Sequence, residues 1–112
     1  MLLAITSQKE EQSSQVEKRF GRAPWFITFN TDTKEYQSFQ NPGTNQSSGA
    51  GVSAAQFIID KKISIIISGD FGPNASRAFQ AAKTEMRLFN ENTLTVQDAI
   101  DQYQNNKLPK FQ

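Results

Sequence analysis

The chain has 112 residues and contains neither cysteine nor histidine. The lack of cysteine excludes disulfide bonds and thiolate ligands for a metal, and the lack of histidine removes the commonest imidazole ligand and general base. Nucleophilic triads of the Ser-His-Asp or Cys-His type are excluded with them. The carboxylates are scattered, and none lies in the first apolar segment, where a metal-dependent nuclease would need one. We therefore expect a protein without enzymatic activity.

The charge balance and the apolar runs exclude further classes of protein. Lys and Arg number 12 and Asp and Glu number 11, so the formal net charge is +1. Such a balance gives no general attraction to nucleic acids or to anionic membranes. No apolar run approaches the ~20 residues that a membrane helix needs, and Met1 to Ile5 is too short and uncharged for a signal peptide. We expect a cytoplasmic protein that binds neither nucleic acid nor membrane.

The hydrophobic pattern predicts strands and helices within one domain that spans residues 1–112. The strands are expected at Leu2–Thr6, Trp25–Asn30, Glu35–Gln40, Ile63–Ser68 and Glu85–Phe89, and the helices at Val52–Lys62, Pro73–Lys83 and Val96–Asn105. Because helices alternate with strands in the second half, their connections must be parallel crossovers. The order β-β-β-α-β-α-β-α therefore predicts an α/β fold, with a mixed five-stranded sheet and helices on both faces.

Two strands and one helix carry more specific signals. The nearly continuous isoleucine run of Ile63–Ser68 predicts a strand in the middle of the sheet, covered on both faces. Tyr36 and Phe39 fall on opposite faces of the strand Glu35–Gln40, which has no clean apolar side and is therefore predicted at an edge. Thr95, with Asp98 three residues later, resembles a capping box at the start of the last helix.

The segment Arg19–Pro24 is the first candidate for a binding site. Its glycine permits a positive φ, and its proline fixes φ ahead of the strand. Its two guanidinium groups suit a phosphate, a carboxylate or a negatively charged cluster, because their donors form a fixed fork. The candidate ligand contacts are Arg19, Phe20, Gly21 and Arg22. The structural alternative is a rigid corner whose aromatic side chains enter the core.

The turn Gly69–Ala75 is the second candidate, because it follows the Ile63–Ser68 strand and opens a helix. Ligands of open α/β sheets bind beyond the carboxyl ends of the strands, and free N–H groups at a helix start attract anions. The candidate contacts are Gly69, Gly72 and Asn74. Asp70 would oppose an anion here, and the Gly-Lys-Ser/Thr ending of a P-loop is missing. The alternative is a tight turn in which Gly72 or Asn74 caps the helix.

The loop Asn41–Gly51 is the third candidate. Long ordered loops in compact domains are often functional, and Asn41 is its candidate ligand contact. The alternative is a flexible connector, which the glycine and serine content favours.

These motifs together resemble the dinitrogenase iron-molybdenum cofactor biosynthesis family, with its NifX-like and NifB C-terminal-like domains. The resemblance covers most of the chain and lies in Phe20–Pro24, Asn41-Pro42, Gly49–Gly51, Gly69–Ala75 and Thr95–Ala99 with Tyr103 and Leu108. It implies a ribonuclease H-like three-layer fold and a non-enzymatic accessory protein. It also implies binding of iron-sulfur or iron-molybdenum clusters, with nitrogenase or iron-sulfur assembly proteins as partners.

The chain departs from the family pattern at three places. Arg19 stands where many relatives have histidine, the loop Thr44–Ser48 lacks the histidine or cysteine that relatives often place there, and Lys83 lies in a turn that usually holds a glycine. A cluster would therefore be held by charge, by backbone N–H groups, or by carboxylate and amide oxygens, and we assign no residue as a metal ligand. The alternative function is a protein-interaction domain that kept the fold and lost cluster binding, with the edge strand recruiting a second copy or another partner.

Overall fold

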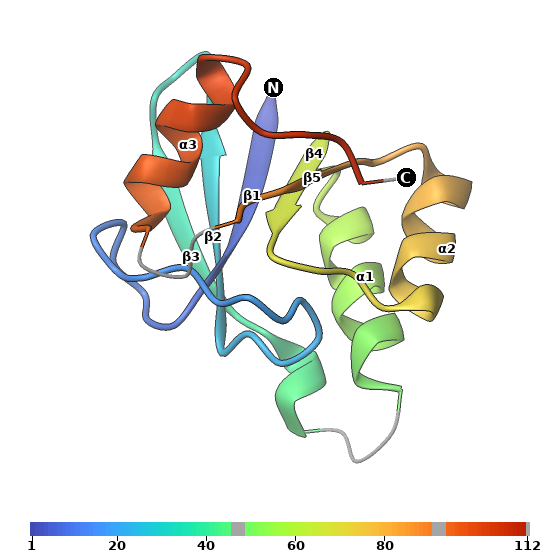
Figure 1. Ribbon diagram of the computed structural model, residues 1–112. Coiled ribbons are helices and arrows are strands. Elements are labelled where there is room, and N and C mark those ends of the chain that lie inside the picture. Colours follow the sequence, from blue (N-terminus) through green and yellow to red (C-terminus); the bar gives the residue numbers. More distant parts are fainter. Residues whose placement is uncertain (46–48, 91–93, 112) are drawn as a thin grey trace.

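The computed structural model describes residues 1–45, 49–90 and 94–111, which build a sheet between layers of helices (Figure 1). The strands are β1 (Leu2–Ser7), β2 (Trp25–Asn30), β3 (Tyr36–Gln40), β4 (Ile65–Ser68) and β5 (Glu85–Leu88). The helices are α1 (Ala50–Asp60), α2 (Pro73–Ala82) and α3 (Val96–Gln104), and a 3-10 helix, η1 (Pro42–Asn45), precedes α1. The observed order confirms the β-β-β-α-β-α-β-α pattern and adds η1.

The strands lie in the order β3-β2-β1-β4-β5. β1 is antiparallel to β2, and β2 to β3, whereas β4 is parallel to both β1 and β5. The mixed sheet and the edge position of β3 are thus confirmed. The prediction that Ile63–Ser68 contains an interior strand covered on both faces is confirmed, whereas its exact middle position is wrong, because β1 occupies the middle and β4 lies beside it. All of β4 is buried, so the isoleucine run indicated burial and left the strand order open.

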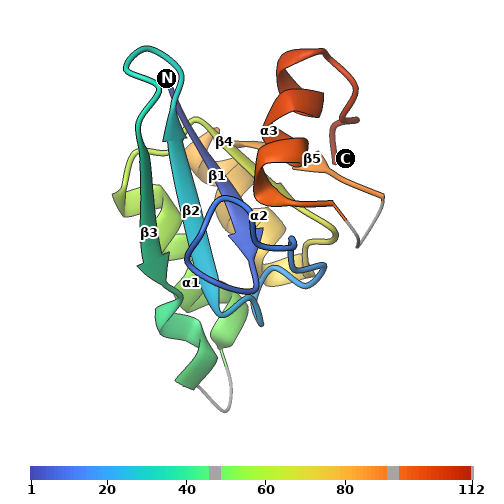
Figure 2. The same ribbon diagram turned by 90° about the vertical axis from the view of Figure 1, so that its left-hand side faces the viewer.

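The two faces of the sheet carry different helices. α1 and α2 cover one face and α3 covers the other (Figures 1 and 2). Alternate residues of a strand serve opposite faces. In β4, Ile66 belongs to the core beneath α1 and α2, whereas Ile65 and Ile67 belong to the core beneath α3. The phenylalanines Phe20, Phe26 and Phe79, all fully buried, fill the α1–α2 side.

The helix starts differ in how well the sequence predicted them. At α3, Thr95 Oγ1 accepts from the Asp98 N–H and Asp98 Oδ2 accepts from the Thr95 N–H, both at 3.1 Å. This confirms the capping box. α1 begins at Ala50, ahead of the predicted Val52, and η1 occupies part of the predicted loop. The rest of that loop, residues 46–48, lies outside the described residues.

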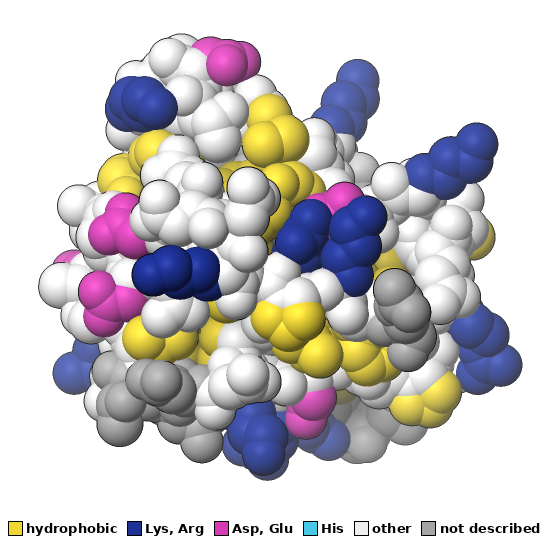
Figure 3. Space-filling view, turned by 45° about the horizontal axis from the view of Figure 1, so that its top comes forward, with side chains coloured by type: hydrophobic (Ala, Val, Ile, Leu, Met, Phe, Trp, Pro, Cys, Tyr) yellow, Lys and Arg dark blue, Asp and Glu magenta, His cyan; other side chains and the backbone are white. Residues whose placement is uncertain are grey.

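The face of the molecule in Figure 3 carries both basic and acidic side chains. In the view of Figure 3, basic side chains are spread over the surface and do not join into one continuous patch. None of the helices in the described ranges is long and apolar enough to cross a membrane.

Candidate functional site

The predicted segments meet where the parallel strands end and the helices α1 and α2 begin, at the lower end of the molecule in Figure 1. A cleft of about 220 Å³ lies between them. Its lining residues are Phe20, Gly21, Gly49, Ala50, Gly51, Val52, Gly72, Pro73, Asn74 and Ala75. None of these side chains is charged, so the field inside the cleft comes from the backbone.

Both helices direct uncapped N-terminal ends at this cleft. Gly49 precedes α1 and Gly72 precedes α2, and neither helix start has a side-chain cap. The first intrahelical bonds run from the Ser53 N–H to the Gly49 carbonyl and from the Ser76 N–H to the Gly72 carbonyl. The N–H groups of the helical residues ahead of Ser53 and Ser76 therefore have no partner in the described part of the chain. Such groups, with the positive ends of two helix dipoles, favour an anion.

Small residues let the three segments approach closely. A Cβ atom on Gly21 would lie 3.3 Å from both Cα and N of Gly51, and one on Gly51 would lie 3.8 Å from Cβ of Ala75. The Phe20–Pro24 segment therefore packs against the first turn of α1, and the first turn of α1 packs against α2. The positive φ that we expected at Gly21 is absent, because Gly49 is the glycine with a positive φ (73°) in the described residues. Gly21 is needed for the close approach instead.

Asn41 is buried beside the cleft and joins its walls. Its Nδ2 donates to the carbonyl oxygens of Ala23 at 2.9 Å and Gly21 at 3.4 Å, and its Oδ1 accepts from the Gly43 N–H at 2.8 Å. A Cβ on Gly43 would lie 2.4 Å from the Ala50 carbonyl oxygen, so this segment packs directly on the start of α1. Since the amide of Asn41 is occupied by these bonds, its role is to position the turn against α1.

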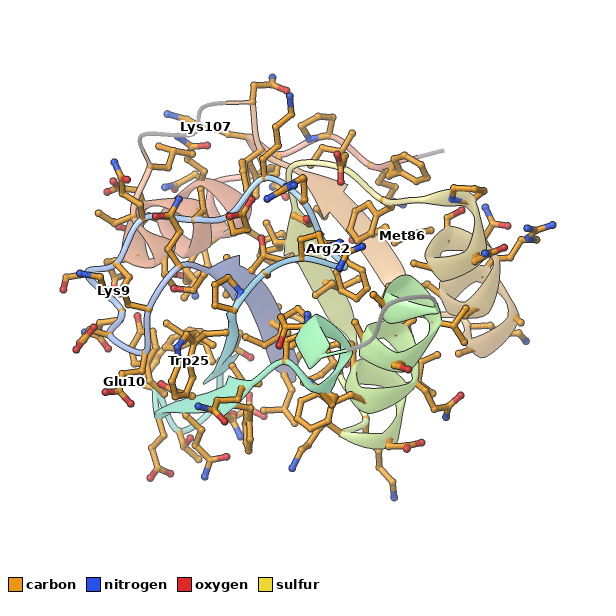
Figure 4. All side chains as sticks on the ribbon, turned by 90° about the horizontal axis from the view of Figure 1, so that it is seen from below. Lys9, Glu10, Arg22, Trp25, Met86 and Lys107 are labelled. Atoms are coloured by element: carbon orange, nitrogen blue, oxygen red, sulfur yellow. The ribbon has the colours of Figure 1, made fainter. Side chains whose placement is uncertain are left out.

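Arg22 lies next to the cleft and lines a second, open hollow of about 660 Å³ together with Pro24, Trp25, Gln40, Asn41, Pro42 and Thr44. Its side chain is exposed and makes no ion pair within the part of the chain that the structure describes. Figure 4 looks onto this end of the molecule, and Arg22 lies near its centre, close to the start of α1. An arginine in this place is available to an anion at the rim of the cleft.

Arg19 and Gly69 lie where the segment after β4 packs against residues 18–19, beyond the ends of the strands. The Ser68 hydroxyl donates to the Lys18 carbonyl at 3.2 Å. A Cβ on Gly69 would lie 2.8 Å from the Lys18 backbone, so a glycine is required there. The Arg19 guanidinium is exposed, and its Nε lies 3.7 Å from Oε2 of Glu17. That carboxylate neutralises part of its charge.

The cleft thus unites some of the predicted contacts and leaves others outside. Phe20, Gly21, Gly72 and Asn74 line it, whereas Arg19, Arg22, Asn41 and Gly69 do not. Phe20 is 1% exposed and serves as a wall. Asn74 accepts a bond of 2.6 Å from Nη2 of Arg77 through its Oδ1.

Sequence reasoning placed Gly49–Gly51 in the candidate loop Asn41–Gly51 but did not recognise it as the start of α1, and it named only Asn41 there as a ligand contact. The helical pattern of apolar residues begins at Val52, so the first turn was assigned to the loop. The signal that could have found it is the run Gly49-Ala50-Gly51, in which small residues permit close backbone approach.

The donor set of this region limits how a metal could be held. In the described ranges, no group of three or more Asp and Glu side chains is placed to hold a metal ion. The cleft lining itself offers backbone N–H groups, the Asn74 amide and apolar walls. These groups suit a whole anion, held by hydrogen bonds, better than a bare cation.

Residues 1–106 match the model of the dinitrogenase iron-molybdenum cofactor family. The chain belongs to this family. The apo form of the orange protein from Desulfovibrio gigas is similar to it, with 28% identity, a TM-score of 0.93, and coverage of 98% of this chain and 92% of that one. A NifB candidate from Thermotoga is similar at 29% identity and a TM-score of 0.85, covering 97% and 91%. A search of curated proteins found no significant match.

Lys83 ends α2 at the place where the family resemblance leads us to expect a glycine. Its φ is 61° and its ψ is 33°, in the left-handed region. Glycine adopts this conformation without the clash that a Cβ brings. The position therefore retains the geometry for which a glycine is suited, although the side chain is lysine.

Proposed function

We propose that this member of the dinitrogenase iron-molybdenum cofactor family is a non-enzymatic accessory protein that carries an anionic metal-sulfur cluster. The cargo is an iron-sulfur or iron-molybdenum cluster, and it occupies the cleft between α1 and α2. The observation that carries this proposal is the convergence of two uncapped helix starts on a single cleft without a carboxylate in its lining. A compact anion of a different kind would be held by the same groups.

The chemistry of the cleft determines how such a cargo is held. Without cysteine or histidine, the chain offers no thiolate or imidazole bond to the metal. Clusters that depend on protein thiolates are therefore poor candidates. A cluster whose own sulfides complete its coordination needs only hydrogen bonds and compensating charge. The N–H groups of α1 and α2 supply the bonds, and the exposed guanidinium of Arg22 supplies charge at the rim.

A cargo held without metal–protein bonds can leave intact, which suits a carrier. Nitrogenase or iron-sulfur assembly proteins are the partners that the family implies. The ribonuclease H-like fold is proposed together with them. It is supported by the antiparallel β1, β2 and β3 followed by the parallel β4 and β5, in the order β3-β2-β1-β4-β5.

The second candidate function is a protein-interaction domain that kept this fold and lost the cluster. The open edge of β3 favours it, because an exposed strand can pair with another chain. The two functions differ in what the purified protein takes up from a cluster donor.

The test is an anaerobic titration of the protein with a cluster donor, followed by removal of excess donor and measurement of bound iron, bound molybdenum and the visible spectrum. A carrier should retain metal in a fixed ratio and become coloured. Gly72→Asp, which places a carboxylate at the mouth of the cleft, is the matched control and should retain far less. A colourless wild-type protein without metal at saturating donor would exclude the carrier function and leave the interaction domain.

A further inference from the structure

The two edges of the sheet are finished in different ways. At β5, the Leu88 N–H donates to the Pro109 carbonyl and the Phe111 N–H donates to the Met86 carbonyl, both at 3.0 Å. The C-terminal segment of the chain thus pairs with β5 and covers that edge. At the other side of the sheet, β3 is the outermost strand, with no further strand beside it in the described residues (Figure 2).

The pairing with β2 determines which backbone groups of β3 face outward. The Asn30 N–H donates to the Glu35 carbonyl and the Asn41 N–H to the Pro24 carbonyl, both at 3.0 Å. Along one strand of an antiparallel pair, residues whose N–H and C=O groups bond to the neighbouring strand alternate with residues whose groups point the other way. Residues 35, 37, 39 and 41 therefore bond to β2. The N–H and C=O groups of residues 36, 38 and 40 point away from the sheet, and within the described part of the chain none of them has a backbone partner.

The β3 segment lacks the sequence features by which proteins protect such strands, although the Ser38 hydroxyl donates to the Glu10 carbonyl of the loop after β1. The segment Tyr36–Gln40 contains no charged residue and no proline, and its pairing with β2 is regular without a bulge. Edge strands of monomeric proteins are usually blunted by lysine, proline or a bulge. The side chains of Gln37, Ser38 and Gln40 are exposed, so a second strand can reach the backbone.

We propose that the β3 edge pairs with the β3 edge of a second copy of this chain, antiparallel and centred on Ser38. The edge is its own complement, because a two-fold axis at Ser38 places Tyr36 opposite Gln40 of the second copy and brings every outward donor to an outward acceptor. The segment Tyr36–Gln40 carries no charge that would favour an oppositely charged partner over a second copy. Pro42 and Glu35 lie just beyond the paired segment and limit its length.

The same register gives apolar contact across the axis. Phe39 lies on the α1 side of the sheet, where its ring is 5.8 Å from that of Phe57 and the Lys61 ammonium is 4.2 Å from its centroid. With Ser38 on the axis, each Phe39 is opposite Gln37 of the second copy and diagonal to its Phe39. Diagonal neighbours across an antiparallel pair lie within reach of aromatic side chains. The pairing is independent of the proposed carrier function, since the cleft uses none of these residues, and it gives a specific partner to the β3 edge on which the second candidate function rests.

The first test is sedimentation over a range of concentrations for the wild type, Ser38→Lys, Ser38→Glu and an equimolar mixture of the two variants. Like charges directly opposite each other destabilise a strand pair, so each variant alone should raise the dimer dissociation constant by up to about fivefold. The mixture should restore the dimer, because lysine then faces glutamate. Ser38→Ala is the control. It loses the hydroxyl bond to the Glu10 carbonyl, as the charged variants do, but should dimerise like the wild type.

Hydrogen exchange of individual amides provides the second test. The N–H groups of Tyr36, Ser38 and Gln40 should exchange quickly in dilute protein and slowly in concentrated protein, whereas those of Gln37 and Phe39 should be slow in both. A wild type that remains monomeric at millimolar concentration would overturn the proposal. Dimers of the Ser38→Lys variant as tight as those of the wild type would overturn it as well, because they would place the contact elsewhere.

Discussion

Nδ2 of Asn41 donates a hydrogen bond of 2.9 Å to the carbonyl oxygen of Ala23, 18 residues earlier in the chain. This bond ties the turn on one wall of the cleft to the segment that leads through η1 into α1. The cleft therefore depends on a buried amide that does not line it. The positions of the N–H groups at the helix starts depend on this bracing as well as on the helices themselves.

Replacement of this amide should weaken the fold. Asn41→Ala leaves the Ala23 carbonyl and the Gly43 N–H buried without their partner, and we expect a loss of about 1–3 kcal/mol in the free energy of unfolding. Asn41→Asp keeps the acceptor for Gly43 but turns a carboxylate toward carbonyl oxygens, so its loss at neutral pH should be larger. Acidification should recover part of that excess, as the carboxyl group becomes protonated and can donate. Urea denaturation at two pH values measures both effects. Equal stability of Asn41→Ala and wild type would contradict the bracing role.

Gly72 offers a direct test of the cleft. Its φ of −70° suits any residue, and a Cβ there would meet nothing within 4 Å. Gly72→Asp should cap α2, raise stability by about 0.5 kcal/mol and reduce anion binding about tenfold or more, because its carboxylate competes for the same N–H groups. Gly72→Asn caps without charge and should have an intermediate effect on binding. Thermal melts and the anaerobic titration measure the two quantities. Undiminished binding by Gly72→Asp would mean that the anion lies elsewhere.

Arg22 distinguishes a binding role from a structural one. Because its guanidinium is exposed and without an ion pair in the described ranges, Arg22→Ala should change stability by less than about 0.5 kcal/mol. Loss of one charge-assisted hydrogen bond should weaken cluster binding by roughly 1.5–3 kcal/mol. Arg22→Lys keeps the charge but loses the fork, so its binding should fall between the two. A clear drop in melting temperature for Arg22→Ala without cargo would show that Arg22 braces the turn.

Replacement of Lys83 by glycine should stabilise the folded protein. The left-handed φ of 61° destabilises the folded state by about 1–2 kcal/mol for a residue with a Cβ. Glycine removes this strain, but its greater conformational freedom in the unfolded chain offsets part of the gain. We expect Lys83→Gly to raise the free energy of unfolding by about 0.5–1 kcal/mol. Lys83→Ala keeps the Cβ and should give no such gain, which separates relief of backbone strain from loss of the charge. Chemical denaturation of both variants checks this, and equal effects would assign the change to the lysine side chain.

The amino-acid sequence by itself determined the elements and the family. Features that depend on only a few neighbouring residues could be predicted from the local pattern alone. The isoleucine run reported a buried strand, Thr95 with Asp98 placed the start of α3, and the two-faced pattern of Tyr36 and Phe39 placed β3 at an edge. The lack of cysteine and histidine likewise limited the chemistry of the chain, because no fold can supply a thiolate or an imidazole that the sequence does not contain.

Only the tertiary structure decided strand order and the composition of the cleft. A buried strand has the same apolar pattern in the middle of the sheet or beside it, so β1 and β4 could not be ordered by hydrophobicity. The start of α1 joined the site because Gly21 and Gly51 let two backbones distant in the chain approach within van der Waals contact. The same packing turned Asn41 from a candidate contact into a buried brace, since its partners come from separate loops that only the folded chain brings together.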